Sequence, residues 1–239
     1  MANNYFRFKQ FTVHQEQAAM KVTTDACLFG AWAAKNIAHN TKGNNILDIG
    51  TGTGLLSLMI AQEVNAQIDA IEIDKAAAEQ AKENTANSPW KDRIHILHGD
   101  ARVFDFNKQY DNIISNPPFY ENELTSGNML KNTAHHDAGL LISELLGIIS
   151  RQLKDDGRFF LLLPFKRHEE IKAAISKYGM KLGTICMVKQ SRAHSFFRVL
   201  IAGGKKEGVL QMEELAIKEN SSDYTTEFSK LLKDYYLYL

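Results

Sequence analysis

The sequence predicts a doubly wound α/β fold, with a mostly parallel sheet covered by helices on both faces. Three observations predict this class. Short apolar runs alternate with helical patterns along most of the chain, and the runs are apolar almost throughout, as in strands buried on both faces. A glycine-rich turn follows the first run. Because ligands of such sheets bind at the carboxyl ends of the strands, we expect the functional residues directly after the strands.

The alternation continues for about 160 residues, and each element is assigned from its own pattern. The apolar runs predict strands at residues 44–50, 66–74, 93–99, 110–116, 157–164, 180–189 and 196–204. Helical spacing and straight-chain residues predict helices at residues 53–64, 75–88, 138–153 and 166–179. Since no linker or repeat divides the chain, we expect one domain: an N-terminal segment (1–40), a core (41–205) and a C-terminal extension (206–239).

The overall composition excludes several classes of protein. Lys and Arg together number 28, and so do Asp and Glu, which gives a formal net charge of zero. A surface that binds nucleic acid would therefore have to come from local clustering of basic residues. Cys27 and Cys186 are the only cysteines, too few for a disulfide framework or a zinc site. No secretory signal is visible, and no apolar run approaches the ~20 residues that span a bilayer. We therefore expect a soluble cytoplasmic protein without a metal, and we favour a monomer.

The turn after the first strand, "LDIGTGTG", places Gly50, Gly52 and Gly54 before a helix. Glycine allows positive φ and leaves room for a ligand, which would meet backbone N–H groups at the helix N-terminus. The spacing differs from the dinucleotide pattern G-x-G-x-x-G. Two carboxylates follow the next strands: Glu72 is placed to bind ribose hydroxyls, and Asp100 to accept from an adenine amino group. Each feature alone is compatible with a tight turn or a solvated charge, whereas together they indicate an adenosine site.

The fourth strand ends in "SNPPF", residues 115–119. Each proline fixes its own φ and keeps the preceding residue extended, so Asn116, Pro117 and Pro118 form a stiff segment. The Asn116 side-chain oxygen and the Pro117 carbonyl are then suited to accept both N–H bonds of an amino group, and Phe119 offers a face for stacking a base. The alternative is a Pro-Pro turn that only terminates the strand.

These motifs, with "IEID" and "GDA", resemble those of the Rossmann-like methyltransferases that act on planar amino nitrogens: adenine N6, guanine N2 or glutamine N5. The resemblance implies S-adenosylmethionine as cofactor and about seven strands, the last one antiparallel. It implies that Asp48 and Gly50 lie near the methionine end and that Glu72 holds the ribose. The other cofactor-binding residues it implies are Gly52, Gly54, Ile73, Asp100, Ala101 and Asn116.

The segments "FRFKQFTVHQEQAAMKVTTDACLFGAW", "NTAHHDAGLLISELL" and "YTTEFSKLLKDYYL" resemble bacterial tRNA methyltransferases that modify adenine 37, next to the anticodon of a valine tRNA, at N6. Thr23 and His135 depart from that family, which usually has Gly and often Arg there. The resemblance implies that Lys21, Thr24 and Asp25 form the entrance to the methionine end; the alternative is a helix cap at Thr24 or Asp25. Alternatives are methylation of guanine N2 in ribosomal RNA, of glutamine N5 in protein, or a non-catalytic adenosine-binding module that grips RNA.

The densest basic region lies around the turn between the last two predicted strands. There Lys189, Arg192 and Arg198 are expected to neutralise RNA phosphates, unless they belong to an ordinary solvated strand edge. Residues 120–137 are polar and aperiodic, so we expect a lid over the substrate, or else a plain surface loop. His135 and His136 within it lack the partner side chains that a metal site would need.

Overall fold

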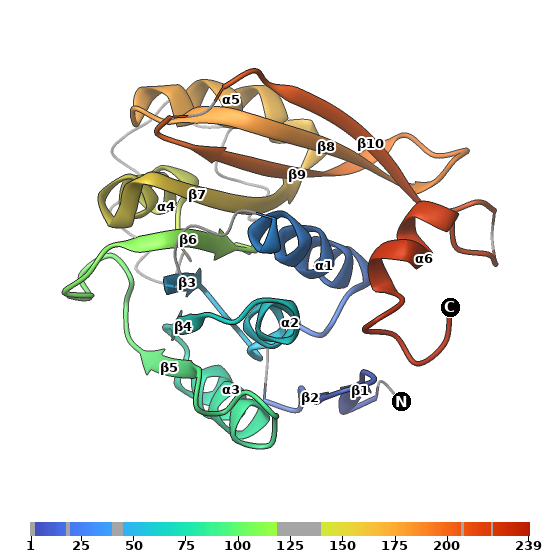
Figure 1. The fold of residues 1–239 in the computed structure, drawn as a ribbon, viewed down its shortest axis with the longest axis horizontal. Helices are drawn as coiled ribbons and strands as arrows, with labels where there is room; N and C mark the ends of the chain where they lie inside the picture. Colours follow the sequence, from blue (N-terminus) through green and yellow to red (C-terminus); the bar gives the residue numbers. More distant parts are fainter. Residues whose placement is uncertain (1–2, 18–19, 40–44, 119–139, 207, 221) are drawn as a thin grey trace, which may run out of the picture.

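The computed structural model describes residues 3–17, 20–39, 45–118, 140–206, 208–220 and 222–239, which include an eight-stranded sheet (Figure 1). The strand order is β10-β8-β9-β7-β6-β3-β4-β5. In chain order these strands are β3 (Asn45–Ile49), β4 (Gln67–Glu72), β5 (Ile94–His98), β6 (Tyr110–Ser115), β7 (Leu153–Pro164), β8 (Lys181–Ser191), β9 (Phe196–Gly204) and β10 (Gln211–Lys218).

All strand pairs are parallel except those of β9, which runs antiparallel to both β7 and β8. The expected fold class is therefore confirmed, including its one antiparallel strand. The sheet has one strand more than expected, because β10 pairs in parallel with β8 at the edge. Only Leu215 and Ile217 of β10 are buried, so its sequence lacks the continuous apolar run that marks the inner strands.

Helices cover both faces of the sheet, with α1, α2 and α3 in front of it in Figure 1. The helices are α1 (Thr24–Ala38), α2 (Leu55–Glu63), α3 (Lys75–Ala86), α4 (Ile142–Gln152), α5 (His168–Lys177), which follows the short 3-10 helix η2 (Phe165–Arg167), and α6 (Thr226–Leu232). Of the described helices, none is long and apolar enough to cross a bilayer.

Two apolar cores lie on opposite sides of the sheet, because side chains alternate along a strand. In β7, Phe160 and Leu162 pack in the core that contains residues of α1, α2 and α6. Their neighbours Phe159 and Leu161 pack in the core of α4 and α5. The strands are thus buried on both faces, which explains their near-continuous apolar sequence.

The two ends of the chain meet. A hairpin of β1 (Tyr5–Arg7) and β2 (Thr12–His14) lies next to the C-terminal residues, where Phe8 bridges to Tyr236. The rings of Phe8 and Tyr236 are 6.0 Å apart, and the Tyr235 hydroxyl donates to the Met59 carbonyl in α2 at 3.0 Å. The C-terminal extension therefore contributes to the core beside α1 and α2.

Candidate functional site

The glycine-rich turn between β3 and α2 has the conformation that its sequence demands. Gly50, Gly52 and Gly54 have φ of 73°, 56° and 82°, in the left-handed region that other residues avoid. A Cβ added to Gly50 or Gly52 would have no atom within 4 Å, whereas one on Gly54 would touch Ala81 of α3 at 3.6 Å. The space above Gly50 and Gly52 is therefore open, and Gly54 brings α3 close to the turn.

Glu72, the last residue of β4, holds this turn in place. Its Oε2 accepts from the Gly52 N–H at 2.8 Å, and its Oε1 accepts from the Asp74 N–H at 2.9 Å. The N–H groups of Gly50 and Thr51 donate to the Ile71 carbonyl. The N–H groups of Gly50, Thr51 and Gly52 therefore fasten the turn to β4, whereas the Gly54 N–H donates to the Thr51 carbonyl within the turn. Each Glu72 oxygen retains a second lone pair for an incoming hydroxyl.

Asp48 lies beneath the turn and is fully buried. Its Oδ2 accepts from the hydroxyls of Thr51 and Ser57, each at 2.7 Å, and its Oδ1 has no hydrogen-bond partner among the described residues. Burial raises the pKa of Asp48 to about 6, and the two hydroxyl bonds oppose that shift. The carboxylate ties the turn to the first helical turn of α2.

Asp100 follows β5, and its carboxylate is already engaged. The Arg102 Nε donates to both of its oxygens at 2.9 Å, and this guanidinium holds the pKa of Asp100 below its usual range. Arg102 also lies 3.7 Å from Glu144 of α4, so it joins the end of β5 to that helix. An adenine amino group would share Asp100 with Arg102, a partner that the sequence analysis missed although it lies two residues away.

The Asn-Pro-Pro segment follows β6, whose neighbour is β3. The hydroxyl of Ser115 donates to the Ile49 carbonyl at 2.7 Å and so ties the end of β6 to the start of the glycine turn. The Asn116 Oδ1 is buried without a hydrogen-bond partner in the described part of the chain. Pro117 is buried and Pro118 exposed. Phe119, the expected lid 120–137 and both its histidines lie outside the described residues.

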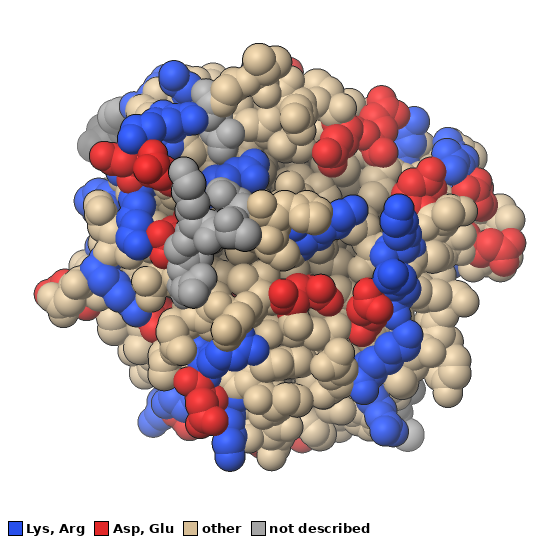
Figure 2. All heavy atoms as spheres, viewed as in Figure 1, with Lys and Arg blue, Asp and Glu red and all other residues tan. Residues whose placement is uncertain are grey.

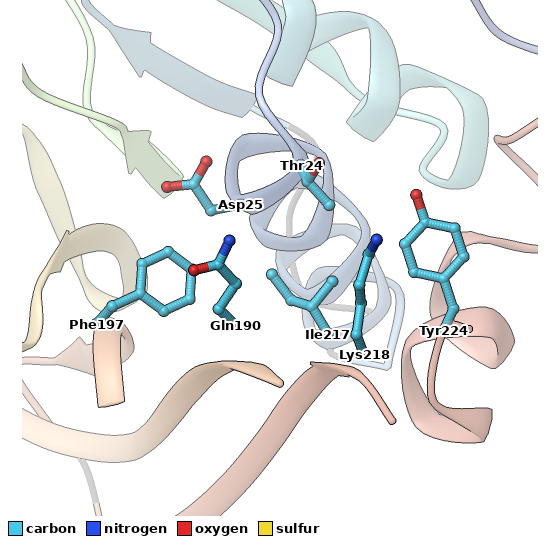
Figure 3. Close-up of a pocket in the computed structure, with 7 residues that line it drawn as sticks. All are labelled: Thr24, Asp25, Gln190, Phe197, Ile217, Lys218 and Tyr224. Carbon is cyan, nitrogen blue, oxygen red and sulfur yellow. The ribbon is translucent and has the colours of Figure 1, made fainter. Parts of the chain in front are cut away.

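Two of the three expected entrance residues line a pocket. Thr24 and Asp25 border a cavity of about 250 Å³ together with residues of β8, β9 and β10 and with Tyr224 (Figure 3). Lys21 is exposed. The N-cap of α1 is Thr23, whose side chain accepts from the Ala26 N–H at 3.4 Å. The Asp25 Oδ1, in the first turn of the helix, accepts from the same N–H at 3.2 Å, so Asp25 shares in the capping.

The three cations expected to bind RNA each contact a carboxylate. Arg192 Nε lies 2.6 Å from Glu219, Arg198 Nε 2.7 Å from Asp25, and Lys189 Nζ 3.9 Å from Glu214. Figure 2 likewise shows acidic and basic side chains interspersed over the visible face. The ion pair thus connects Asp25, which was expected to bind the cofactor, with Arg198, which was expected to bind RNA. The pair of Asp25 and Arg198 has no signal in the sequence, because the two residues lie 173 positions apart.

A buried amide that no sequence pattern indicated also supports the turn. Asn84 of α3 is 1% exposed; its Oδ1 accepts from the His14 N–H, and its Nδ2 donates to the carbonyls of His14 and Thr53, all at 2.9 Å. Gln15, next to His14, accepts from the Val22 N–H at 2.8 Å. Together they connect the N-terminal segment with the glycine turn. An Asn in an alanine-rich helix was the only local sign.

In the described residues, no group of three or more His, Cys, Asp or Glu side chains is arranged to hold a metal ion. The polar groups at the ends of β3, β4, β5 and β6 instead lie along one edge, because these strands pair in parallel. This edge offers hydrogen-bond acceptors in a row above a glycine turn, an arrangement suited to an organic cofactor.

Comparison with known proteins agrees with this arrangement. The family model "Methyltransferase small domain" matches residues 32–171. A crystal structure of a predicted O-methyltransferase from Agrobacterium tumefaciens has a TM-score of 0.64 at 19% identity, over 88% of this chain and 96% of that one. The glycopeptide N-methyltransferase MtfA complexed with S-adenosylmethionine has a TM-score of 0.55 at 12% identity, over 74% and 94%. Such low identities show the fold alone.

This fold, with the family match across its core, defines the class: the protein is an S-adenosylmethionine-dependent methyltransferase. Two relatives narrow the class. The chain is 39% identical to the tRNA1(Val) (adenine(37)-N6)-methyltransferase of Cytophaga hutchinsonii over 100% of both chains, and 42% identical to that of Dyadobacter fermentans over 98% of each. The chain belongs to the tRNA1(Val) (adenine(37)-N6)-methyltransferase family, which confirms the resemblance drawn from its motifs.

The residues present fit the cofactor of this class. Gly50 and Gly52 leave open space above the turn, and Glu72 has lone pairs for two ribose hydroxyls. The side chain of Ile73 follows directly and is exposed, so it leaves an apolar surface uncovered beside Glu72. Asp100 and Ala101 lie at the end of the next strand, where the expected adenine would be.

Proposed function

We propose that the protein methylates N6 of adenine 37 in tRNA1(Val), the reaction named for its relatives. The observation that carries the proposal is the buried Asn116 Oδ1, which has no partner among the described residues. An unsatisfied buried acceptor is unfavourable unless a ligand supplies the missing donor. An exocyclic amino group supplies that donor, and the Pro117 carbonyl is suited to accept its second N–H.

Bound S-adenosylmethionine supplies an electrophilic methyl group on a sulfonium. Glu72 and Ile73 hold the ribose, Asp100 and Ala101 face the adenine, and Asp48 keeps the glycine turn in shape at the methionine end. Lys21, Thr24 and Asp25 line the entrance to the methionine end of the cofactor site. Asn116 and Pro117 engage both N–H bonds of the target amino group, which directs its lone pair at the methyl group and stabilises the positive charge that develops on nitrogen. Phe119 stacks on the extruded base.

The remaining expectations belong to the same proposal. We propose that the chain acts as a single domain, that Lys189, Arg192 and Arg198 contact RNA phosphates by exchanging their carboxylate partners, and that the enzyme works in the cytoplasm, where its tRNA substrate is found. Exchange of partners is reasonable for Arg192, because both it and Glu219 are exposed and exposed ion pairs are weak.

The test is incubation of the protein with labelled S-adenosylmethionine and separate pools of tRNA, ribosomal RNA and protein. We expect label in tRNA alone, recovered as N6-methyladenosine by mass spectrometry and mapped next to the anticodon of tRNA1(Val). Label in N2-methylguanosine of ribosomal RNA, or in glutamine of a protein, would replace the proposed substrate with one of the alternatives. Binding of RNA without any transfer would indicate a non-catalytic module.

A further inference from the structure

A pocket at the carboxyl edge of the sheet lies beside the proposed cofactor entrance, because Thr24 and Asp25 belong to its lining. Its other lining residues have no role in the proposed transfer. It is bounded by the N-terminus of α1, by the ends of β8 and β10, by the start of β9 and by Tyr224. In Figure 3, Asp25 and Phe197 lie on one side of it, Lys218 and Tyr224 on the other, and Gln190 between them. Its volume is about 250 Å³. Pockets for drug-sized ligands measure ~300–1,000 Å³, so this one suits a smaller group.

The lining combines an aromatic ring with hydrogen-bonding groups. Phe197 supplies the ring, Gln190 an amide that both donates and accepts, and Lys218 an ammonium donor. Asp25, the carboxylate in the lining, is paired with Arg198 at 2.7 Å. The pocket therefore suits a planar polar group more than a strong anion or cation. A nucleobase has these properties: a face that stacks and an edge that both donates and accepts.

The walls of the pocket are held in place before any ligand arrives. The Arg198 guanidinium lies 5.2 Å from the centre of the Phe197 ring while it binds Asp25. On the opposite side, Tyr224 stacks on Phe228 with ring centres 4.6 Å apart, and Lys218 lies 5.7 Å from the centre of the Tyr224 ring. A preorganised wall loses little side-chain entropy on binding.

The pocket is close to the end of β6. Arg198, next to Phe197, lies opposite Pro164 in the register of β9 against β7, at the end of β7. The other neighbour of β7 is β6. Two strand spacings, about 10 Å in all, therefore separate the β9 wall of the pocket from the strand that leads into Asn116. A nucleotide next to the target in the same RNA chain can span that separation when the strand is splayed.

We propose that this pocket binds the base of a nucleotide that flanks the methylated adenine, an inference that rests on the proposed RNA substrate. The base stacks on Phe197, and its edge is read by Gln190 and Lys218. The enzyme thereby recognises the sequence around its target by a contact separate from the one that performs the chemistry.

The test combines protein variants with abasic RNA. Phe197→Ala should raise the KM for a tRNA anticodon stem–loop about ten-fold or more, the size expected when a base–aromatic stack is lost, with cofactor affinity unchanged. In the parent enzyme, an abasic site at one position flanking the target should raise the KM equally. In Phe197→Ala, the same abasic site should add nothing, because the stack is already absent. Gln190→Ala, which removes an exposed side chain, provides a second variant if Phe197→Ala folds poorly.

The matched control is Tyr178→Ala. Tyr178 is a partly buried aromatic residue at the C-cap of α5, three positions before β8 begins at the opposite edge of the sheet. The KM of Tyr178→Ala for RNA should equal that of the parent enzyme. The inference is overturned if abasic sites on either flank leave the KM of the parent enzyme unchanged. It is also overturned if Phe197→Ala and the abasic site each raise KM independently, so that their fold-changes multiply. A third contrary result would be weaker cofactor binding, instead of a raised KM for RNA, in both pocket variants. Absence of adenine methylation in the parent enzyme would refute the proposed function itself, a separate outcome.

Discussion

At the scale of single residues, Asn116 has the most specific role. Its Oδ1 is buried without a partner in the described residues, and the proposed role is to accept an N–H of the substrate. Asn116→Ala should reduce methyl transfer at least about 100-fold, as removal of one preorganised transition-state hydrogen bond does elsewhere. Initial rates with labelled cofactor would measure the loss, and calorimetry should show cofactor affinity nearly unchanged. Asn65→Ala, an exposed asparagine after α2, is the control. Equal rates in the parent and Asn116→Ala would contradict the mechanism.

Asp48 gives a prediction on stability and pH. Its pKa is raised from 3.8 to about 6, chiefly by burial. A carboxyl group with a raised folded-state pKa favours the folded state while it is protonated, and this contribution is lost as the pH rises from about 4 to above 6. The loss amounts to about 3 kcal/mol at pH 7.

Asp48→Asn cannot titrate at this position, so its stability relative to the parent should increase between pH 4 and pH 7. Urea unfolding at four pH values would measure the difference. Thr51→Val offers a comparison, since it removes one hydroxyl donor but leaves the carboxyl group. If the difference in the free energy of unfolding between Asp48→Asn and the parent stayed constant with pH, Asp48 would not titrate in this way.

At the scale of elements, α3 supports the glycine turn through Asn84. Asn84→Ala removes three hydrogen bonds, two to part-buried backbone groups of His14 and one to the buried Thr53 carbonyl. We expect a loss of at least about 2 kcal/mol in the free energy of unfolding and weaker cofactor binding, because the turn loses a support. Denaturant unfolding and calorimetry would measure the two effects.

Two further substitutions separate this role from general damage to α3. Asn84→Asp keeps the acceptor for the His14 N–H but lacks both donors, so it should fall between the parent and Asn84→Ala. Asn87→Ala, at the exposed C-cap of the same helix, should change cofactor affinity little. If Asn87→Ala weakened cofactor binding as much as Asn84→Ala, the connection through Thr53 would not be the cause.

At the scale of the whole molecule, charge is balanced both in total and locally. The chain has 28 basic and 28 acidic residues, and Arg192 contacts both Glu219 and Glu227. Glu219→Gln should remove the closer of the two carboxylates that hold Arg192 and leave only Glu227, at 3.5 Å. RNA affinity should rise a few-fold, and the dependence of log Kd on log salt should steepen by up to about one unit. Glu63→Gln, at the end of α2, makes the same change in net charge elsewhere and is the control. Equal effects of the two variants would indicate net charge alone.

The sequence alone determined the order of β3 to β9 and of α2 to α5, the glycine turn, the strand-end carboxylates and the Asn-Pro-Pro segment. These features are local: a strand buried on both faces needs a continuous apolar run, and a turn with positive φ needs glycine. The same locality made the family recognisable, since its motifs are short and occur in a set order along the chain.

The tertiary structure alone decided which of these residues meet. It paired Asp25 with Arg198, seated the hairpin of β1 and β2 against the C-terminus, and added β10 as an edge strand. It also placed Asn84 beneath the glycine turn and opened a pocket between α1 and β10. Such contacts depend on chain segments far apart in sequence that packing brings together, and neither composition nor spacing records that proximity.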